Sequence, residues 1–366
     1  MLTVHPTLLI GPSDWDAERM PSAEFVGRIE ALFEKHPGAE RAIVFGNSRH
    51  HAELAYFTNL VPKLGPALAL ISRDGAHRMF VGDAANMLGA ARPLTFIEDL
   101  ASMKEAASAI AAGKSQRTLL IGADYMPTAL RGTITEAVGK ETSDATAQAW
   151  RQMARKSGYE LDAIDIAMKL NGIARKAMRE ALMAGAGVAG VVVTGERAAH
   201  AAGAQEVRSL FSLDGGRTLQ PFLARVDQTI DPLLIYLAIR RFNYWAESFP
   251  LFTQDPAPTK LYDKAWDVLM RAAAVIKAGI ATRDVAELIA AGIAPYQVHP
   301  VTAKSWAQRM GIALDEAPHT EVGETFEEGE VYSLRIGAAD EPRESLICSR
   351  MFIVGKDGIT AFDEQP

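Results

Sequence analysis

The 366-residue sequence contains one cysteine, Cys348, which excludes an internal disulfide framework and a cluster of thiolate metal ligands. It has no long uncharged apolar stretch, and its first twenty residues lack the basic segment, apolar core and cleavage site of a signal peptide. The net charge is -7 and basic residues form no cluster, so the sequence predicts no basic surface that would bind nucleic acid. We therefore expect a cytoplasmic protein that binds no nucleic acid or membrane and acts on a small molecule.

The composition predicts a globular chain of about two domains, because 48% of the residues are hydrophobic and 23% are charged. Within residues 1–150, short apolar runs alternate with helical segments and are bounded by Gly, Asp or Asn. These runs are residues 42–45, 67–72, 79–81 and 118–121. Such alternation indicates a small α/β domain. From residue 160 an apolar stripe keeps helical spacing, with Asn171 as its polar interruption, so a second domain is expected over residues 151–366.

The segment LLIYLAIRRFNYWAE at residues 233–247 carries most of the functional information. Its apolar run from Leu233 to Ile239 predicts a buried strand, and Asn243-Tyr244 predicts the turn into a second strand. A hairpin of this kind delivers side chains into a pocket. Two further strands are expected in GEVYSLRIG and ESLICSRMFIVGKDG, near the end of the chain.

The order of these segments resembles the family of creatinase, prolidase and aminopeptidase P. The segment Tyr56-Phe57-Thr58-Asn59-Leu60 resembles the N-terminal domain of creatinases and prolidases, and the hairpin at 233–247 resembles the family's metal-ligand hairpin. The resemblance covers roughly residues 50 to 362. It implies an α/β (α+β) protein with a small creatinase-like N-terminal domain at 1–150, followed by a pita-bread domain at 151–366. It also implies a homodimer.

Metal-dependent relatives bind two divalent ions through two Asp, one His and two Glu, and the resemblance places these ligands on this chain. The first Asp falls on Tyr236 and the second, eleven residues later, on Glu247. No residue from 307 to 314 is the ligand histidine, and the two Glu fall on Arg335 and near Ser349 or Cys348. The resemblance therefore implies a site without metal or other cofactor.

Creatinase and ectoine hydrolase resemble this fold and hydrolyse C–N bonds without metal. The resemblance thus favours a metal-independent hydrolase acting on a small carboxylated amide, amidine or cyclic substrate. Glu247 is the predicted acid or base, with His299 and Tyr236 as further catalytic candidates, and Arg335 is the predicted clamp for a substrate carboxylate. Each also has a structural interpretation. Glu247 and Arg335 could form salt bridges, His299 could be a core histidine, and Tyr236 a core aromatic.

Four other residues are predicted to line the substrate site. Glu316 lies in a Glu-Ala-Pro segment that matches a family position near the substrate, and Phe222 replaces the histidine of the family's Pro-His. Tyr244 flanks Glu247, and Met310 lies in the segment where the ligand histidine is missing. Two alternatives stay open: a non-catalytic relative that binds a small ligand or a protein partner, and a metal-dependent Xaa-Pro aminopeptidase or dipeptidase whose ligands are misaligned.

Overall fold

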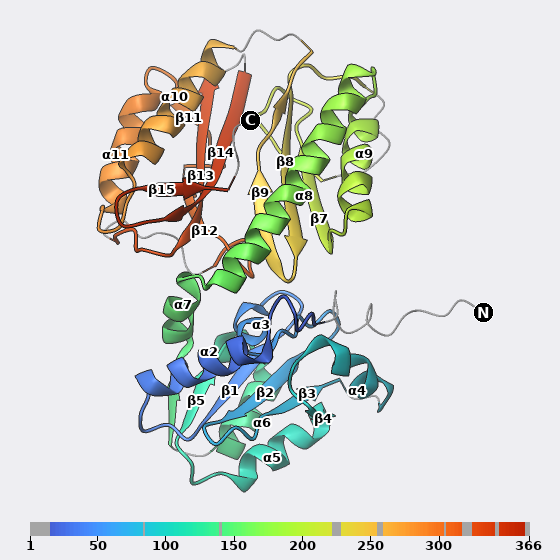
Figure 1. The fold of residues 1–366 in the computed structure, drawn as a ribbon, viewed down its shortest axis with the longest axis vertical. Helices are drawn as coiled ribbons and strands as arrows, with labels where there is room; N and C mark the ends of the chain where they lie inside the picture. The colour runs from blue at the N-terminus through green and yellow to red at the C-terminus, as the bar shows by residue number, and fades with distance from the viewer. Residues whose placement is uncertain are drawn as a thin grey trace, which may run out of the picture. The chain divides into compact units, whose positions relative to one another are not determined.

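The computed structural model describes residues 15–82, 85–138, 141–221, 228–254, 259–303, 305–316, 324–340 and 344–362. The chain divides into two compact units, Met1–Met153 and Ala154–Pro366. The sequence placed the boundary between residues 150 and 151. Figure 1 shows the helices and strands of both units, coloured from the N-terminus to the C-terminus.

Unit 1 is built around a six-stranded sheet in the order β4-β3-β2-β1-β5-β6. Its strands are β1 Arg41–Gly46, β2 Ala67–Ser72, β3 Arg78–Val81, β4 Asp99–Ser102, β5 Thr118–Ile121 and β6 Thr142–Asp144. The helices are α2 Ser22–Lys35, α3 Ala52–Thr58, α4 Ala85–Ala91, α5 Ala106–Ala112, α6 Thr128–Val138 and α7 Thr146–Ala154. Strand β1 is buried along its whole length, pairing antiparallel with β2 and parallel with β5. This mixed sheet with helices around it is the predicted α/β architecture.

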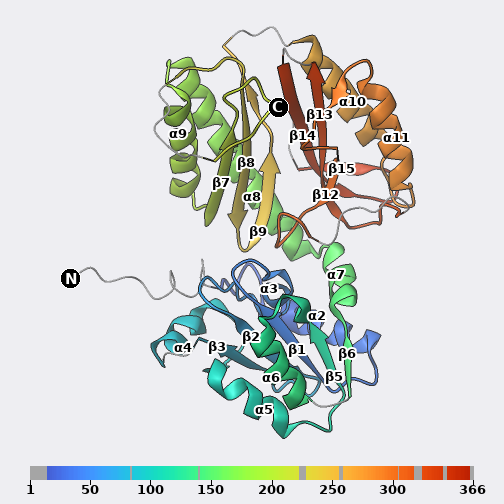
Figure 2. The ribbon, with the colours of Figure 1, turned by 180° about the vertical axis from the view of Figure 1, so that it is seen from behind.

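Unit 2 consists of two half-sheets, each covered on its outer side by a pair of helices (Figures 1 and 2). One half contains α8 Gly158–Met183, α9 Val188–Ala201, β7 Glu206–Phe211, β8 Leu233–Arg241, β9 Tyr244–Ser248 and β10 Leu251–Phe252. The other contains α10 Lys260–Val275, α11 Thr282–Ile293, β11 Gln297–Val298, β12 Ala307–Arg309, β13 Val331–Asp340, β14 Glu344–Val354 and β15 Ile359–Ala361. Strands β9 and β14 lie in contact, so the two half-sheets meet there.

Helix α8 begins at a capping box, in which Ser157 and Glu160 satisfy each other's backbone N–H groups. Its buried stripe packs on the odd-numbered residues of β8. The polar interruption predicted at Asn171 bonds to both strands of the hairpin: its Nδ2 donates to the Leu237 carbonyl over 3.1 Å, and its Oδ1 accepts from Ser248 Oγ over 2.7 Å. Asn171 therefore fixes the helix against the hairpin.

The predicted hairpin is present as β8 and β9, but its turn lies one residue earlier than expected. Phe242 and Asn243 both have positive φ, 49° and 66°, as a two-residue turn of the hairpin type requires. Tyr244 is therefore the first residue of β9.

Strand alternation separates an outer core from an inner face in each half. On β8, Leu233, Ile235, Leu237 and Ile239 pack in the core with α8 and α9, which leaves Tyr236 on the inner face. On β13, Tyr332, Leu334, Ile336 and Ala338 pack against α10 and α11, which leaves Arg335 on the inner face. Glu247 pairs with Ala238, and Arg335 pairs with Ser349, so both lie on the inner faces too.

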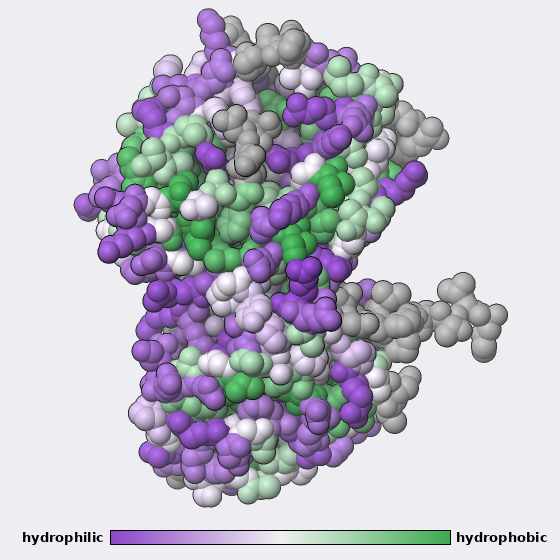
Figure 3. Space-filling view, viewed as in Figure 1, coloured by the Kyte–Doolittle hydropathy of each residue, from purple (hydrophilic) through white to green (hydrophobic). Residues whose placement is uncertain are grey.

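The surface of unit 2 carries scattered apolar side chains. Three of the exposed large ones, Ile173, Met183 and Val193, lie on α8 and α9, and Figure 3 shows hydrophobic residues over these helices. Single exposed apolar residues are usual on folded proteins. In the part of the chain that the structure describes, no helix is both long enough and apolar enough to cross a bilayer.

Candidate functional site

The inner faces of the two half-sheets bring Glu247 and Arg335 together, although they are far apart in the sequence. Arg335 Nε donates to Glu247 Oε1 over 2.6 Å, and Arg335 Nη2 donates to Glu247 Oε2 over 2.7 Å. Glu247 is 1% exposed and Arg335 8%. This bidentate fork is the strongest geometry available to the two groups. It means that the predicted carboxylate clamp already holds a carboxylate of its own chain.

Tyr236 completes the group at the position where the resemblance places the first metal-binding Asp. Its hydroxyl donates to Glu247 Oε2 over 3.0 Å, and its ring lies 4.9 Å from that of Phe249. Burial, and then the negative charge of Glu247, raise the pKa of Tyr236 well above its ordinary value of 10.0. Tyr236 therefore stays protonated at neutral pH. The residue is partly exposed, in contrast to Glu247.

Neighbouring side chains hold the Arg335 guanidinium in place. Its Nη1 donates to Gln308 Oε1, and its Cζ lies 5.7 Å from the ring centroid of Phe249. The backbone N–H of Phe249 donates to Ser349 Oγ over 3.1 Å, which ties β9 to β14. Burial lowers the pKa of Arg335, but the charge of Glu247 and its hydrogen bonds outweigh burial, so the net shift is upward. Arg335 is therefore a permanent cation.

These residues do not fit a pair of divalent cations. They supply one carboxylate, which the fork already engages, together with a tyrosine, a glutamine and an arginine. Among the described residues, no group of three or more His, Cys, Asp or Glu is placed to hold a metal ion. A dication about 5 Å from the guanidinium would be repelled by roughly 6 to 7 kcal/mol at an effective dielectric constant near 20. We derive no chemical step through a metal.

His299 is fully buried and lies against Gly337 of β13, two residues after Arg335. Its Nδ1 accepts from the Val301 N–H over 3.1 Å, so Nε2 carries the hydrogen and donates to the Gly216 carbonyl over 2.9 Å. Both ring nitrogens are thus engaged with the backbone. The role of proton carrier predicted for His299 is not supported by this geometry, because the ring instead holds the turn at Gly216.

Tyr244 does not lie beside Glu247, contrary to the expectation from the sequence. Residues of β9 alternate, so Tyr244 occupies the face opposite to Glu247 and points to α8. There its hydroxyl donates to Glu160 Oε1 over 3.0 Å. The physical reason is that Tyr244 and Glu247 are three residues apart, and positions an odd number apart on one strand face opposite sides of the sheet.

Glu316 is paired with a residue that the sequence did not single out. It forms a buried salt bridge with Lys156, in which both side chains are at most 2% exposed. Burial raises the pKa of Glu316, and Lys156 offsets part of that rise. Met310 is fully buried, and its N–H donates to the Val331 carbonyl. Phe222 lies outside the described residues.

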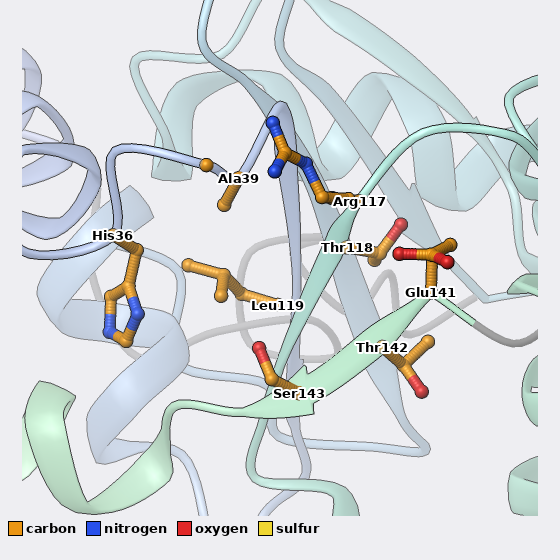
Figure 4. A pocket seen from close by; sticks show the side chains of 9 residues that line it. His36, Ala39, Arg117, Thr118, Leu119, Glu141, Thr142 and Ser143 are labelled. Carbon is orange, nitrogen blue, oxygen red and sulfur yellow. The ribbon is translucent and has the colours of Figure 1, made fainter.

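Sequence reasoning missed Gln308 and Lys156. Gln308 lies opposite Ser333 on the short strand β12, and strand alternation puts it on the same face as Arg335. Alternation could have identified Gln308 once β12 was recognised, whereas the partner of Glu316 is 160 residues distant. A separate pocket of about 310 Å³ lies in unit 1 (Figure 4). None of the predicted site residues lines it, and its lining includes His36, Arg117, Glu141 and Ser143.

Comparison with known families agrees with this architecture. The family model for metallopeptidase family M24 matches residues 137–359, more than half of the chain. The chain therefore belongs to family M24, which confirms the resemblance drawn from its segments. No curated protein sequence matches it.

Solved structures show the same fold over nearly the whole chain. The prolidase from Pyrococcus horikoshii is 15% identical with a TM-score of 0.75, covering 94% of this chain and 99% of that one. The X-Pro aminopeptidase from Thermotoga maritima is 14% identical with a TM-score of 0.77, covering 92% and 98%. Aminopeptidase P from E. coli is 12% identical with a TM-score of 0.75, covering 93% and 94%. The predicted α/β fold with a pita-bread domain is thus confirmed.

Proposed function

We propose that this chain is a metal-independent member of family M24, whose cleft binds a small amide or amidine that carries a carboxylate. The observation that supports this most is the Arg335–Glu247 fork with Tyr236 on its cleft side. The fork supplies its own permanent cation at the position where the resemblance implies metal ligands. A bound dication would have to displace that cation.

The hydrogen-bond roles at Tyr236 indicate the kind of group that binds there. Its hydrogen is given to Glu247, and its raised pKa keeps it protonated, so its oxygen is left to accept a hydrogen bond from a ligand. Amide and amidine N–H groups are such donors. Tyr236 is partly exposed, whereas Glu247 behind it is buried. A ligand therefore meets Tyr236 before it meets the charged pair.

The favoured role is binding without turnover, because Glu247 is engaged through both oxygens. Arg335 occupies Oε1 and Oε2, and Tyr236 also donates to Oε2. The second buried candidate, His299, is engaged through both ring nitrogens. A general base must reach the proton that it abstracts, and Glu247 is only 1% exposed while both ring nitrogens of His299 are bonded to the backbone.

Hydrolysis of a C–N bond without metal is the second candidate. It is favoured by the direct hydrogen bond between Tyr236 and Glu247, which joins a cleft-side hydroxyl to a buried carboxylate. In this case the Tyr236 oxygen would take a proton from the attacking water while the Tyr236 hydrogen moves to Glu247. That proton would return through Tyr236 to the leaving nitrogen as the C–N bond breaks. Opening one arm of the Arg335 fork would be required.

Calorimetric titration with glutaramide and with glutaramate tests the proposal, using metal-free wild-type protein and Tyr236→Phe. Both ligands should bind to the wild type, and loss of the acceptor oxygen should weaken both by about two- to tenfold. Absence of binding by both ligands would refute the proposed function. Ammonia release by the wild type that disappears in Glu247→Gln would establish hydrolysis over binding alone.

A further inference from the structure

Two arginines stack on one tryptophan on the inner face of the β7–β9 sheet. The Arg208 Cζ lies 4.6 Å from the ring centroid of Trp245, and the Arg240 Cζ lies 5.1 Å from it. Trp245 is 2% exposed and Arg240 is 4% exposed, whereas the side chain of Arg208 is 52% exposed. Cation–π contacts hold both guanidinium groups at a fixed place. One of the two faces solvent.

A single carboxylate, that of Glu206, is shared between these two cations. Its Oε1 accepts from Arg208 Nε over 2.8 Å, and its Oε2 lies 2.6 Å from Arg240 Nη2. The cluster of Arg208, Arg240, Glu206 and Trp245, here called the arginine cluster, therefore carries one net positive charge. An excess positive charge beside an aromatic ring is a feature of anion recognition rather than of a balanced core.

The buried member of the cluster has unused hydrogen-bonding capacity. Within the described part of the chain, the Nε–H of Arg240 is buried and has no hydrogen-bond partner. Burial lowers the pKa of Arg240, Glu206 raises it and Arg208 lowers it again. A buried donor without a partner costs free energy, and an acceptor brought by a ligand would remove that cost.

The arginine cluster lies next to Tyr236 in the register of the sheet. Arg208 pairs with Ala238, and Leu210 pairs with Tyr236, so Arg208 and Tyr236 are diagonal neighbours on one face. Diagonal positions of paired strands are about 7–8 Å apart. A ligand with a short spacer can therefore contact both positions.

We propose that the arginine cluster binds the carboxylate of the cleft ligand, with Arg208 as the specificity-determining residue. This inference deepens the proposed function and rests on it, because it assigns the acidic end of the ligand whose N–H end meets Tyr236. The sequence had given the carboxylate to Arg335. The fork with Glu247 occupies Arg335, whereas Arg208 is exposed and belongs to a cluster with surplus positive charge.

The test compares three isosteric probes by calorimetry at low ionic strength: glutarate with two carboxylates, glutaramate with one, and glutaramide with none. The proteins are the wild type, Arg208→Gln and Arg208→Lys. Arg283→Gln is the matched control, because Arg283 is an exposed arginine of α11 that pairs with Glu287 and lies in the same unit. Circular dichroism confirms that each variant is folded.

Wild-type protein should bind glutarate and glutaramate at least about tenfold more tightly than glutaramide, and Arg208→Gln should lose that preference. Arg208→Lys should retain part of it, and Arg283→Gln should retain all of it. Equal binding of the three probes by the wild type, no binding of glutarate, or an unchanged preference in Arg208→Gln would overturn the inference. A failure of the proposed function alone gives a different result. The affinity for glutaramide would then be the same in the wild type and in Tyr236→Phe, while the preference for carboxylate probes would still be lost in Arg208→Gln.

Discussion

Removing one partner of the Arg335–Glu247 fork should destabilise unit 2 much more than removing both. The two groups are joined by contacts of 2.6 and 2.7 Å, which puts the charge centres about 4 Å apart. At an effective dielectric constant near 20 the attraction is about 4 kcal/mol. Because both groups are buried, Glu247→Gln or Arg335→Met leaves one charge without its partner and should cost about 3 to 5 kcal/mol.

The double variant Glu247→Gln/Arg335→Met removes both charges at once. It should cost less than either single variant, about 0 to 2 kcal/mol, because no unpaired buried charge remains. Urea unfolding followed by circular dichroism gives the free energies, with each transition fitted separately if the units unfold in two steps. The exposed pair of Arg283 and Glu287 provides a matched control, where substitutions should change stability by less than about 1 kcal/mol. Additive costs for the two fork variants would refute the reasoning.

Three further predictions concern buried groups outside the fork. His299→Gln should lower the free energy of unfolding by about 2 kcal/mol, because it disturbs the hydrogen bonds to Val301 and Gly216. It should leave the affinity for glutaramate unchanged. A weaker affinity in calorimetry would show that the ring belongs to the binding site. Lys156→Met should lower the free energy of unfolding, measured in urea, by about 3 to 5 kcal/mol, because it leaves the buried charge of Glu316 unpaired. The double variant Lys156→Met/Glu316→Gln should lower it clearly less. Equal losses in the two variants would contradict this reasoning. Burial raises the pKa of Cys348 from its ordinary value of 9.0 to about 12, so its contribution to stability is full below about pH 9 and is lost as the pH rises toward 12. The thiol should therefore resist alkylation at pH 8 unless the protein is unfolded, and fast labelling of the folded chain would contradict its burial.

The order of helices and strands could be predicted from the sequence because each one has a local pattern of apolar residues. The hairpin at 233–247, the helix expected from the apolar stripe after residue 160 and the two long C-terminal strands all follow from apolar periodicity. The turn at Phe242 and Asn243 lies one residue before the predicted one. Tyr244 lies on the face opposite to Glu247 because the two residues are three positions apart on β9.

The partners of the site residues could not be read from the sequence. Arg335 and Glu247 are 88 residues apart, and both salt bridges to other residues and a ligand-binding role were open to them. The choice depends on how the two half-sheets meet, which is a property of the folded chain. The same holds for Arg208 and Arg240, whose place on one face follows from the pairing of β7 with β8 and of β8 with β9.

The metal content of the purified protein tests the central claim most directly. The chain should be expressed in medium supplemented with Mn, Zn and Co, dialysed without chelator, and examined by inductively coupled plasma mass spectrometry. A guanidinium paired to the Glu247 carboxylate predicts less than about 0.1 metal ion per chain, with no change in the unfolding temperature on adding EDTA. Two ions per chain that EDTA removes, with a fall in unfolding temperature, would contradict the account.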